Sequence, residues 1–261
     1  MKSLSNLLAI VAASMVAMVA TQAGAETWQT VYQTDFSSDP GWTTDDPTNL
    51  RWDSATGTFH GTQVNVQGTY AYKNVAGFDP NKSWKLAFDS EINSCGWSAG
   101  LTLGLFDSRL TYPWGAIEDQ GWSDGGNGTA LVTNGVGAGV FSPGWSSGTW
   151  YHTLILYDAT TEQVTMNITD RSTGSLFQSQ TQTVTSFPSD MTYLGVSRLH
   201  MKNGYNGVNP NASVDYNLDN VVLSQATPKS SSVPEPSSLV VFSGLGVMGL
   251  VMAWRRRKRA S

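Results

Sequence analysis

The chain has 261 residues, enough for one large all-β domain or two small domains with a sizeable core. Charged residues make up only 13% of it, and the single cysteine excludes an intramolecular disulfide framework and a cysteine-rich zinc site. Residues 26–228 hold 8 lysines and arginines against 19 aspartates and glutamates, a net charge of −11. Such an acidic body repels phosphate backbones, which argues against nucleic acid as a partner.

The N-terminus carries the features of a secretory signal. Lys2 precedes an apolar run from Leu7 to Ala20, and the small residues Ala23 and Ala25 then stand where signal peptidase requires them. The run is too short to span a bilayer well. We expect residues 1–25 to be a cleaved signal peptide; the alternative is an uncleaved anchor.

Residues 26–225 follow the period of β-strands. Apolar and polar residues alternate over 84–93 and 164–170, leucines alternate over 101–105, and residues 150–157 are apolar on both faces, as in an interior strand. Glycine, proline, asparagine and aspartate separate the runs. About a dozen strands of ordinary length predict one all-β domain, a two-sheet antiparallel β-sandwich over 26–225.

Three segments resemble the concanavalin A-like, laminin-G-like jelly-roll superfamily. They are VYQTDFSSDPGW near the N-terminus, the hairpin sequence GTWYHTLILYDATTEQVTMNITD, and VDYNLDNVVL, which is similar to the closing strand that pairs near the first. The resemblance implies a jelly roll and an association with carbohydrate. It implies no particular activity.

Catalytic signatures are weak. Gly-Trp-Ser-x-Gly occurs three times, beginning at Gly96, Gly121 and Gly144, but a serine nucleophile elbow needs a helix after the turn, and a strand pattern follows the first copy. Asp89 and Glu91 lie two apart on one strand face, the carboxylate spacing that glycoside hydrolysis uses. Jelly-roll glucanases resembling this fold carry Glu-x-Asp-x-x-Glu, and both flanking glutamates are missing here. A solvated polar face is the other interpretation.

Metal and cofactor signals are few. The three histidines show no paired ligand spacing, so we expect no transition metal and no organic cofactor. A structural calcium is the remaining candidate, since jelly-roll carbohydrate modules often hold one where the first strand ends. Asp35 at that end and Asp219 in the last strand are its expected ligands. The alternative is that each of these carboxylates accepts hydrogen bonds from local backbone donors.

A tryptophan-bearing stretch from 107 to 148 is the strongest candidate for a binding site. Long loops on a sandwich commonly bind ligands, and flat indoles suit the apolar faces of sugar rings while carboxylates bind their hydroxyls. The predicted ligand-binding residues are Trp114, Trp122, Trp145, Asp119 and Asp124. Two interpretations stay open, because these tryptophans would equally serve as plugs of the sandwich core.

The C-terminus has three parts in order. Residues 226–236 form a polar, proline-containing linker, residues 237–254 an uncharged apolar stretch of a length that can cross a bilayer, and residues 255–261 a basic tail. The positive-inside rule leaves the tail in the cytoplasm and the acidic body outside. We therefore expect one transmembrane helix over 237–254.

This arrangement resembles the PEP-CTERM sorting signal, through Pro234, Glu235 and Pro236, the glycine-rich apolar stretch and the arginine-rich end. In that family an exosortase is thought to cleave near the motif and release the protein from its transient place in the inner membrane, in bacteria that make extracellular polysaccharide. We expect an exported surface protein that binds polysaccharide without catalysis. The alternatives are a polysaccharide hydrolase using Asp89 and Glu91, and a purely structural envelope protein.

Overall fold

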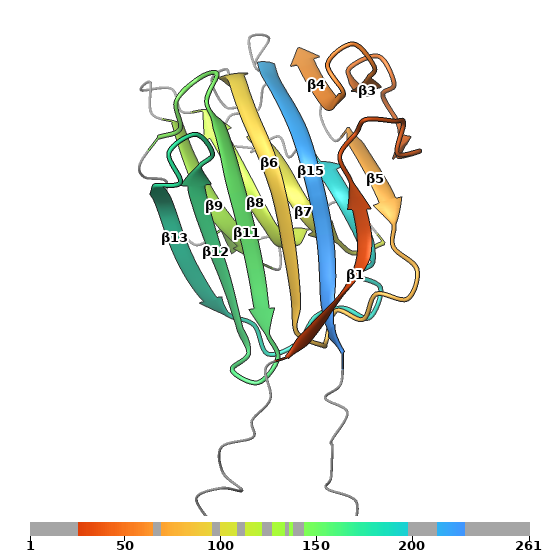
Figure 1. The fold of residues 1–261 in the computed structure, drawn as a ribbon, viewed down its shortest axis with the longest axis vertical. Coiled ribbons are helices and arrows are strands. Elements are labelled where there is room, and N and C mark those ends of the chain that lie inside the picture. The colour runs from red at the N-terminus through yellow and green to blue at the C-terminus, as the bar shows by residue number, and fades with distance from the viewer. Residues whose placement is uncertain are drawn as a thin grey trace, which may run out of the picture. The chain divides into compact units, whose positions relative to one another are not determined.

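The computed structural model describes residues 26–64, 69–95, 100–108, 113–121, 127–133, 136–137, 144–197 and 213–227. These residues contain strands and turns and no helix. The strands form two stacked antiparallel sheets (Figure 1), so the predicted all-β sandwich is confirmed. The residues from Trp28 to Thr227 belong to one compact unit.

The eight-stranded sheet faces the viewer in Figure 1. Its order is β13 (Leu176–Thr183), β12 (Gln163–Asp170), β11 (Trp150–Asp158), β6 (Trp84–Cys95), β15 (Ser213–Thr227), β4 (Thr58–Val64) and β3 (Leu50–Asp53), with β1 (Thr27–Thr34) also paired to β15. The seven-stranded sheet lies behind it. Its order is β10 (Val136–Gly137), β9 (Asn127–Thr133), β8 (Pro113–Gly121), β7 (Gly100–Phe106), β14 (Tyr193–Ser197), β5 (Tyr70–Asn74) and β2 (Thr43–Thr44).

Alternating side chains fill the space between the two sheets. On β6 the residues Leu86, Phe88 and Ile92 are buried in the core, and on β11 Ile155 and Tyr157 lie beside them. Their neighbours in sequence point the other way, onto the outer face of the eight-stranded sheet, as period-2 alternation requires. The outer face of this sheet is therefore specified by the same pattern that specifies the core.

Two expected connections are present. Strands β11 and β12 form the expected hairpin, with Tyr157 paired to Val164 near its turn. The last strand, β15, pairs with the first, as the jelly-roll resemblance implied. Both strands belong to the sheet whose outer face carries the site described below.

A β-bulge interrupts β15. Asp89 of β6 pairs with Asp219, but Ala87, two residues earlier, pairs with Val222, so β15 holds one extra residue between these two pairs. Asn220 lies inside the bulge with a φ of 50°. Asparagine tolerates this left-handed conformation better than most residues, and bulges commonly re-aim side chains.

Glutamines close one side of the sandwich. Gln180 and Gln182 of β13 reach across to β9 of the other sheet, where the Leu131 N–H donates to Gln180 Oε1 at 2.7 Å and the Gln182 amide donates to the Leu131 carbonyl at 2.7 Å. Gln178 similarly donates to the Thr129 carbonyl at 2.9 Å. Side-chain amides thus join the two sheets at this side, where the backbones are too far apart to pair.

The expected signal peptide at 1–25 and the segments from 228 onward lie outside the described residues. The described part of the chain contains no helix of the length and apolarity that crossing a membrane requires. The expected span at 237–254 is not among the residues to which that finding applies.

Candidate functional site on the outer face of the eight-stranded sheet

Two rows of polar side chains run across the strands on the outer face. We call the first the Asp89 row: Thr169, His152, Asp89 and Asp219 are successive register partners on β12, β11, β6 and β15. The second, the Glu91 row, comprises Trp150, Glu91, Asn217 and His60, register partners on β11, β6, β15 and β4. The two rows are adjacent, because their members stand two residues apart along each shared strand.

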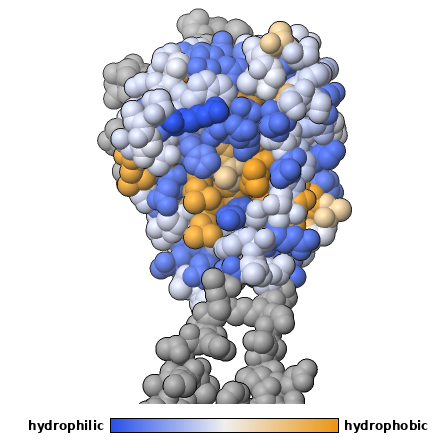
Figure 2. Space-filling view, in the orientation of Figure 1, coloured by the Kyte–Doolittle hydropathy of each residue, from blue (hydrophilic) through white to orange (hydrophobic). Residues whose placement is uncertain are grey.

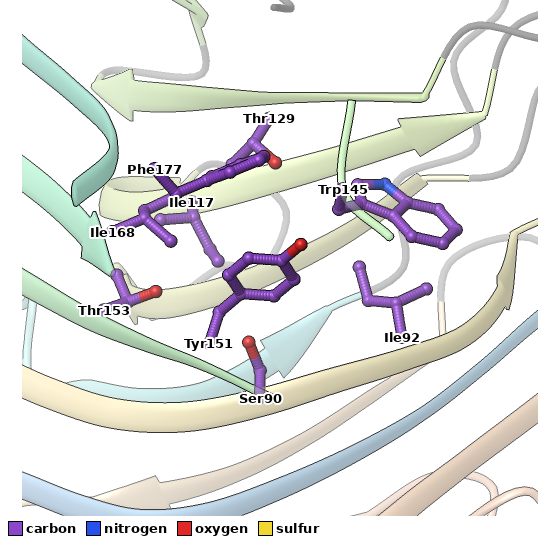
Figure 3. Close-up of a pocket in the computed structure, with 9 residues that line it drawn as sticks. All are labelled: Ser90, Ile92, Ile117, Thr129, Trp145, Tyr151, Thr153, Ile168 and Phe177. Carbon is purple, nitrogen blue, oxygen red and sulfur yellow. The ribbon is translucent and has the colours of Figure 1, made fainter. Parts of the chain in front are cut away.

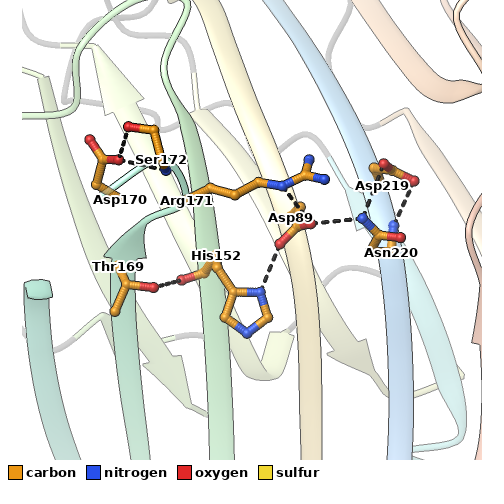
Figure 4. A network of polar contacts seen from close by, with 8 residues as sticks. All are labelled: Asp89, His152, Thr169, Asp170, Arg171, Ser172, Asp219 and Asn220. Carbon is orange, nitrogen blue, oxygen red and sulfur yellow. Dashed lines mark hydrogen bonds and ion pairs between the residues drawn. The ribbon is translucent and has the colours of Figure 1, made fainter. Parts of the chain in front are cut away.

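Asp89 is the centre of the first row (Figure 4). Its carboxylate accepts a hydrogen bond from His152 Nδ1 at 2.7 Å and from Asn220 Nδ2 at 2.8 Å, and forms an ion pair with Arg171 Nε at 3.4 Å. Only 7% of the Asp89 side chain is exposed, although it points away from the core. The Asp89 carboxylate thus fixes three side chains that come from three different strands or turns.

Asp219 stands next to Asp89 without an ion pair among the described residues. The backbone N–H of Asn220 donates to it at 2.8 Å and the Asn220 side-chain amide at 3.2 Å. Burial raises the pKa of Asp219, and the nearby charges of Asp89 and Asp35 raise it further, against the opposing effects of the Asn220 hydrogen bond and the Arg171 charge. The site therefore holds an acidic group whose charge the protein compensates only in part.

The Glu91 row is linked by hydrogen bonds from one strand to the next. Asn217 Nδ2 donates to Glu91 Oε2 at 2.8 Å, and the Asn217 amide oxygen accepts from His60 Nδ1 at 2.8 Å. Because an amide oxygen only accepts, the proton of His60 lies on Nδ1. These contacts hold the polar groups of β6, β15 and β4 in one plane.

A groove opens at the end of the Glu91 row, lined by Gly148, Thr149, Trp150, Arg171 and Ser172. The Arg171 guanidinium carbon lies 5.5 Å from the centre of the Trp150 ring. The backbone N–H of Arg171 donates to the backbone carbonyl of Trp150 at 2.9 Å. Gly148 allows the turn before Trp150, since its φ is 70°. The groove therefore pairs an aromatic ring with a cation beside the Asp89 network.

An apolar row borders the Asp89 row on its other side. Leu154, Ala87 and Val222 are register partners on β11, β6 and β15, and each is only partly buried. Figure 2 shows apolar side chains gathered on this face below a band of hydrophilic ones. The outer face thus offers hydrogen-bonding groups and an apolar strip side by side.

The structure places the predicted tryptophan site differently. Trp145 is a core residue with 7% of its surface exposed, and Trp114 is partly buried with its ring 6.3 Å from that of Phe187. For these two, the core interpretation applies rather than that of an exposed platform, because both indoles pack between the sheets. Asp119 belongs to β8, where only its backbone is described. Trp122 and Asp124 lie outside the described residues.

The two expected calcium ligands lie within electrostatic range of each other, since the charge of Asp35 raises the pKa of Asp219. The hydroxyl and N–H of Ser37 hold the pKa of Asp35 below its usual value. Calcium takes six to eight oxygen ligands, and the described residues contain no group of three or more Asp, Glu, His or Cys side chains placed to hold a metal ion. The two carboxylates are therefore too few by themselves. Calcium stays a prediction, which a calcium titration of the melting temperature would test.

The sequence analysis singled out three carboxylates of this site, Asp89, Glu91 and Asp219, but not the residues around them. It assigned no role to His152, Trp150, Arg171 or Asn220. One signal for the bulge was present: Val214, Tyr216 and Leu218 alternate, and then the buried residues resume at Val221, one position out of phase. A phase break in a strand pattern indicates an inserted residue.

Residues 232–258 match the family model described as the PEP-CTERM protein-sorting motif, which confirms the resemblance. The motif contains the expected Pro234, Glu235 and Pro236, which lie outside the described residues. It implies an exported protein that exosortase sorts to the cell surface. No curated protein sequence matches the chain.

Solved structures with the same fold include lectins and a CBM2 module. Winged bean acidic lectin complexed with methyl-α-D-galactose is 13% identical, covers 77% of this chain and 100% of its own, and gives a TM-score of 0.55. Lectin UEA-II complexed with galactose is 12% identical, covers 78% of this chain and 100% of its own, and gives a TM-score of 0.54. The CBM2 module of the Lactobacillus casei BL23 phage J-1 evolved Dit is 12% identical, covers 78% of this chain and 98% of its own, and gives a TM-score of 0.51. The sandwich therefore has the concanavalin A-like jelly-roll fold.

Proposed function

We propose that this exported protein binds carbohydrate without catalysis, and that the ligand lies on the outer face of the eight-stranded sheet. The observation that carries the proposal is the groove at Trp150 and Arg171, which opens onto two hydrogen-bonded polar rows. The lectin-like fold supports carbohydrate binding as the general class of function. Processing by signal peptidase and exosortase would deliver the domain to a surface or an extracellular polysaccharide matrix.

The chemistry of the face suits a sugar chain. Carboxylates, amides and imidazoles bind hydroxyl groups, and partly exposed apolar groups cover the C–H faces of the rings. The Glu91 row extends over four strands, about 14 Å at the usual strand spacing. Such a row is longer than one sugar ring, so we expect a polymer to bind better than its monomer.

Charge narrows the ligand class. Arg171 is already paired with Asp89, while Glu91 and Asp219 have no cationic partner among the described residues. The whole body is acidic as well. Like charges repel across a binding surface, so the face should reject acidic polysaccharides and accept neutral or amine-bearing ones.

The geometry favours binding over hydrolysis. A general acid or nucleophile must reach the glycosidic bond, but Asp89 is enclosed, accepts hydrogen bonds from two side chains and is ion-paired with a third. Glu91 is engaged by Asn217. Asp89 therefore serves better as an anchor for His152 and Arg171 than as a reacting group.

The test is a panel of soluble polysaccharides in three charge classes, neutral, amine-bearing and acidic, assayed by affinity electrophoresis with the purified protein. We expect retardation by neutral or amine-bearing polymers and none by acidic ones. Binding to no class would contradict the proposal. Bond cleavage that Glu91→Gln abolishes would favour the hydrolase instead.

Processing is tested separately. We expect the mature chain to begin at Glu26 and to end near residues 233–236, as the signal peptide and sorting motif predict. Intact-mass measurement of the extracellular protein checks both ends. A chain that still carries the arginine-rich tail in the inner membrane would contradict this route.

A further inference from the structure

A small cavity lies between the two sheets, behind the outer-face site (Figure 3). Its volume is about 10 Å³. Residues from both sheets line it: Ser90, Ile92, Ile117, Thr129, Trp145, Tyr151, Thr153, Ile168 and Phe177. Three of these are serine or threonine, and two of them, Ser90 and Thr153, occupy positions whose neighbours on the same strand face are apolar. An apolar core would be expected to hold valine or alanine there.

Two polar atoms of the lining have no hydrogen-bond partner within the described protein. They are the Thr153 hydroxyl, on a residue with 0% of its surface exposed, and the indole N–H of Trp145, on a residue with 7% exposed. A buried polar group that has no hydrogen-bond partner destabilises the folded state. Figure 3 shows the hydroxyls of Ser90 and Thr153 turned toward the middle of the lining group. The Thr153 hydroxyl can both donate to and accept from a ligand in the cavity.

We infer that this cavity binds a single water molecule, hydrogen-bonded to Thr153 Oγ1. The volume is about that of one water-sized probe, so it excludes any larger ligand. Cavities of this size with polar walls hold ordered water, whereas purely apolar ones stay dry. A water in this space can bond both the Thr153 hydroxyl and the Ser90 hydroxyl, which point toward the middle of the lining (Figure 3).

The position of the water gives it a structural consequence for the face above it. Thr153 follows His152 on β11, and Ser90 lies between Asp89 and Glu91 on β6. Trp145 precedes the turn that leads into Trp150, and this turn is tied to β6 by the Gly148 N–H, which donates to the Ile92 carbonyl at 3.0 Å. The water thus lies between Thr153 of β11 and Ser90 of β6, directly behind the two rows of the outer face. This inference does not depend on what the groove binds.

The test is a high-resolution crystal structure of the purified protein and of two variants. Thr153→Val removes the hydroxyl with almost no change in shape. Thr102→Val is the matched control, because the Thr102 hydroxyl is also buried without a partner but does not line this cavity. We expect one water within hydrogen-bond distance of Thr153 Oγ1 in the wild type and in Thr102→Val, and none in that cavity in Thr153→Val.

Oxygen-17 relaxation dispersion of the full-length protein in detergent is an independent measurement. It counts the water molecules whose residence time in the protein exceeds the rotational correlation time. Thr153→Val should lose one such water relative to both other proteins. If Thr153→Val fails to fold, Ser90→Ala is measured in its place and should lose the same water. A dry cavity in the wild type, or a water that all variants retain unchanged, would overturn the inference.

Discussion

The side-chain amide of Asn220 donates to the Asp89 carboxylate at 2.8 Å, from a bulge in β15 to the neighbouring strand β6. Asn220 adopts a φ of 50° to do so. Without the extra residue of the bulge, regular alternation would give Asn220 a different orientation. The bulge thus converts a strand residue into a fixed donor for the buried carboxylate, and the arrangement of the Asp89 row depends on it.

Replacing Asn220 by alanine and by glycine separates the contribution of its side-chain hydrogen bond from that of its left-handed backbone conformation. Asn220→Ala removes the donor and places a β-carbon in the left-handed region, so we expect it to lower the free energy of unfolding by about 2 kcal/mol. Asn220→Gly removes the donor but suits the backbone, and should cost about 1 kcal/mol. Urea denaturation measures both. Equal losses would show that the backbone conformation does not contribute.

Arg171 should contribute to stability as well as to the groove. Arg171→Met leaves the enclosed Asp89 carboxylate without its arginine partner, and we expect the free energy of unfolding to fall by about 1–3 kcal/mol. Lys82→Met is the control: its ion pair with Asp79 is roughly half exposed on both sides, and such pairs contribute less than about 1 kcal/mol. Thermal melting compares the two. A loss for Lys82→Met as large as that for Arg171→Met would contradict the role assigned to Asp89.

The acid dependence of stability has two components of opposite sign. The pKa of Asp170 is lowered, mainly by the Ser172 hydroxyl, so its contribution is present above the unfolded pKa and is lost as pH falls through the folded value. The pKa of Asp219 is raised by burial, so its ionised form costs stability that is recovered as pH falls through the raised value. Asp219→Asn should therefore melt no lower than the wild type at pH 7, and its relative advantage should shrink toward pH 4. Melting curves between pH 3 and 7 check this, and a deficit of the variant at pH 7 would contradict it.

Trp145 should behave as a core residue. Its indole belongs to the buried cluster, so Trp145→Ala should lower the free energy of unfolding by about 3–5 kcal/mol. Calorimetric melting of the variant measures this. A variant that melts like the wild type would return Trp145 to the surface role that the sequence first suggested.

Much of the fold followed from periodicity. Alternation placed Leu86, Phe88 and Ile92 on one face of a strand and Asp89 and Glu91 on the other. The first three lie in the core cluster, and the two carboxylates bond His152 and Asn217 on the outer face, so the prediction is confirmed. The hairpin of β11 and β12 was also correctly predicted, because its two runs are close in sequence and separated by a polar turn. Local patterns determine these features, so a single sequence contains them.

The site could not be predicted in the same way. Asp89, His152 and Asn220 meet through register between strands 63 and 131 residues apart, and periodicity carries no register between distant strands. The repeated Gly-Trp-Ser suggested exposed tryptophans, but whether an indole faces outward depends on the sheet behind it. Trp145 packs in the core between the sheets, whereas Trp150, five residues later, lines the groove.

The most direct test of the outer-face site is calorimetric titration of Trp150→Ala with the polysaccharide that the panel identifies. Trp28→Ala is the matched control, because Trp28 also lies beneath a cation of the eight-stranded sheet, Lys85, at 5.0 Å, but does not line the groove. We predict that Trp150→Ala keeps its melting transition and loses about 1–3 kcal/mol of binding free energy, comparable to the transfer of a buried side chain, while Trp28→Ala binds like the wild type. Unchanged binding by Trp150→Ala, or an equal loss in both variants, would contradict the assignment of the ligand to this groove.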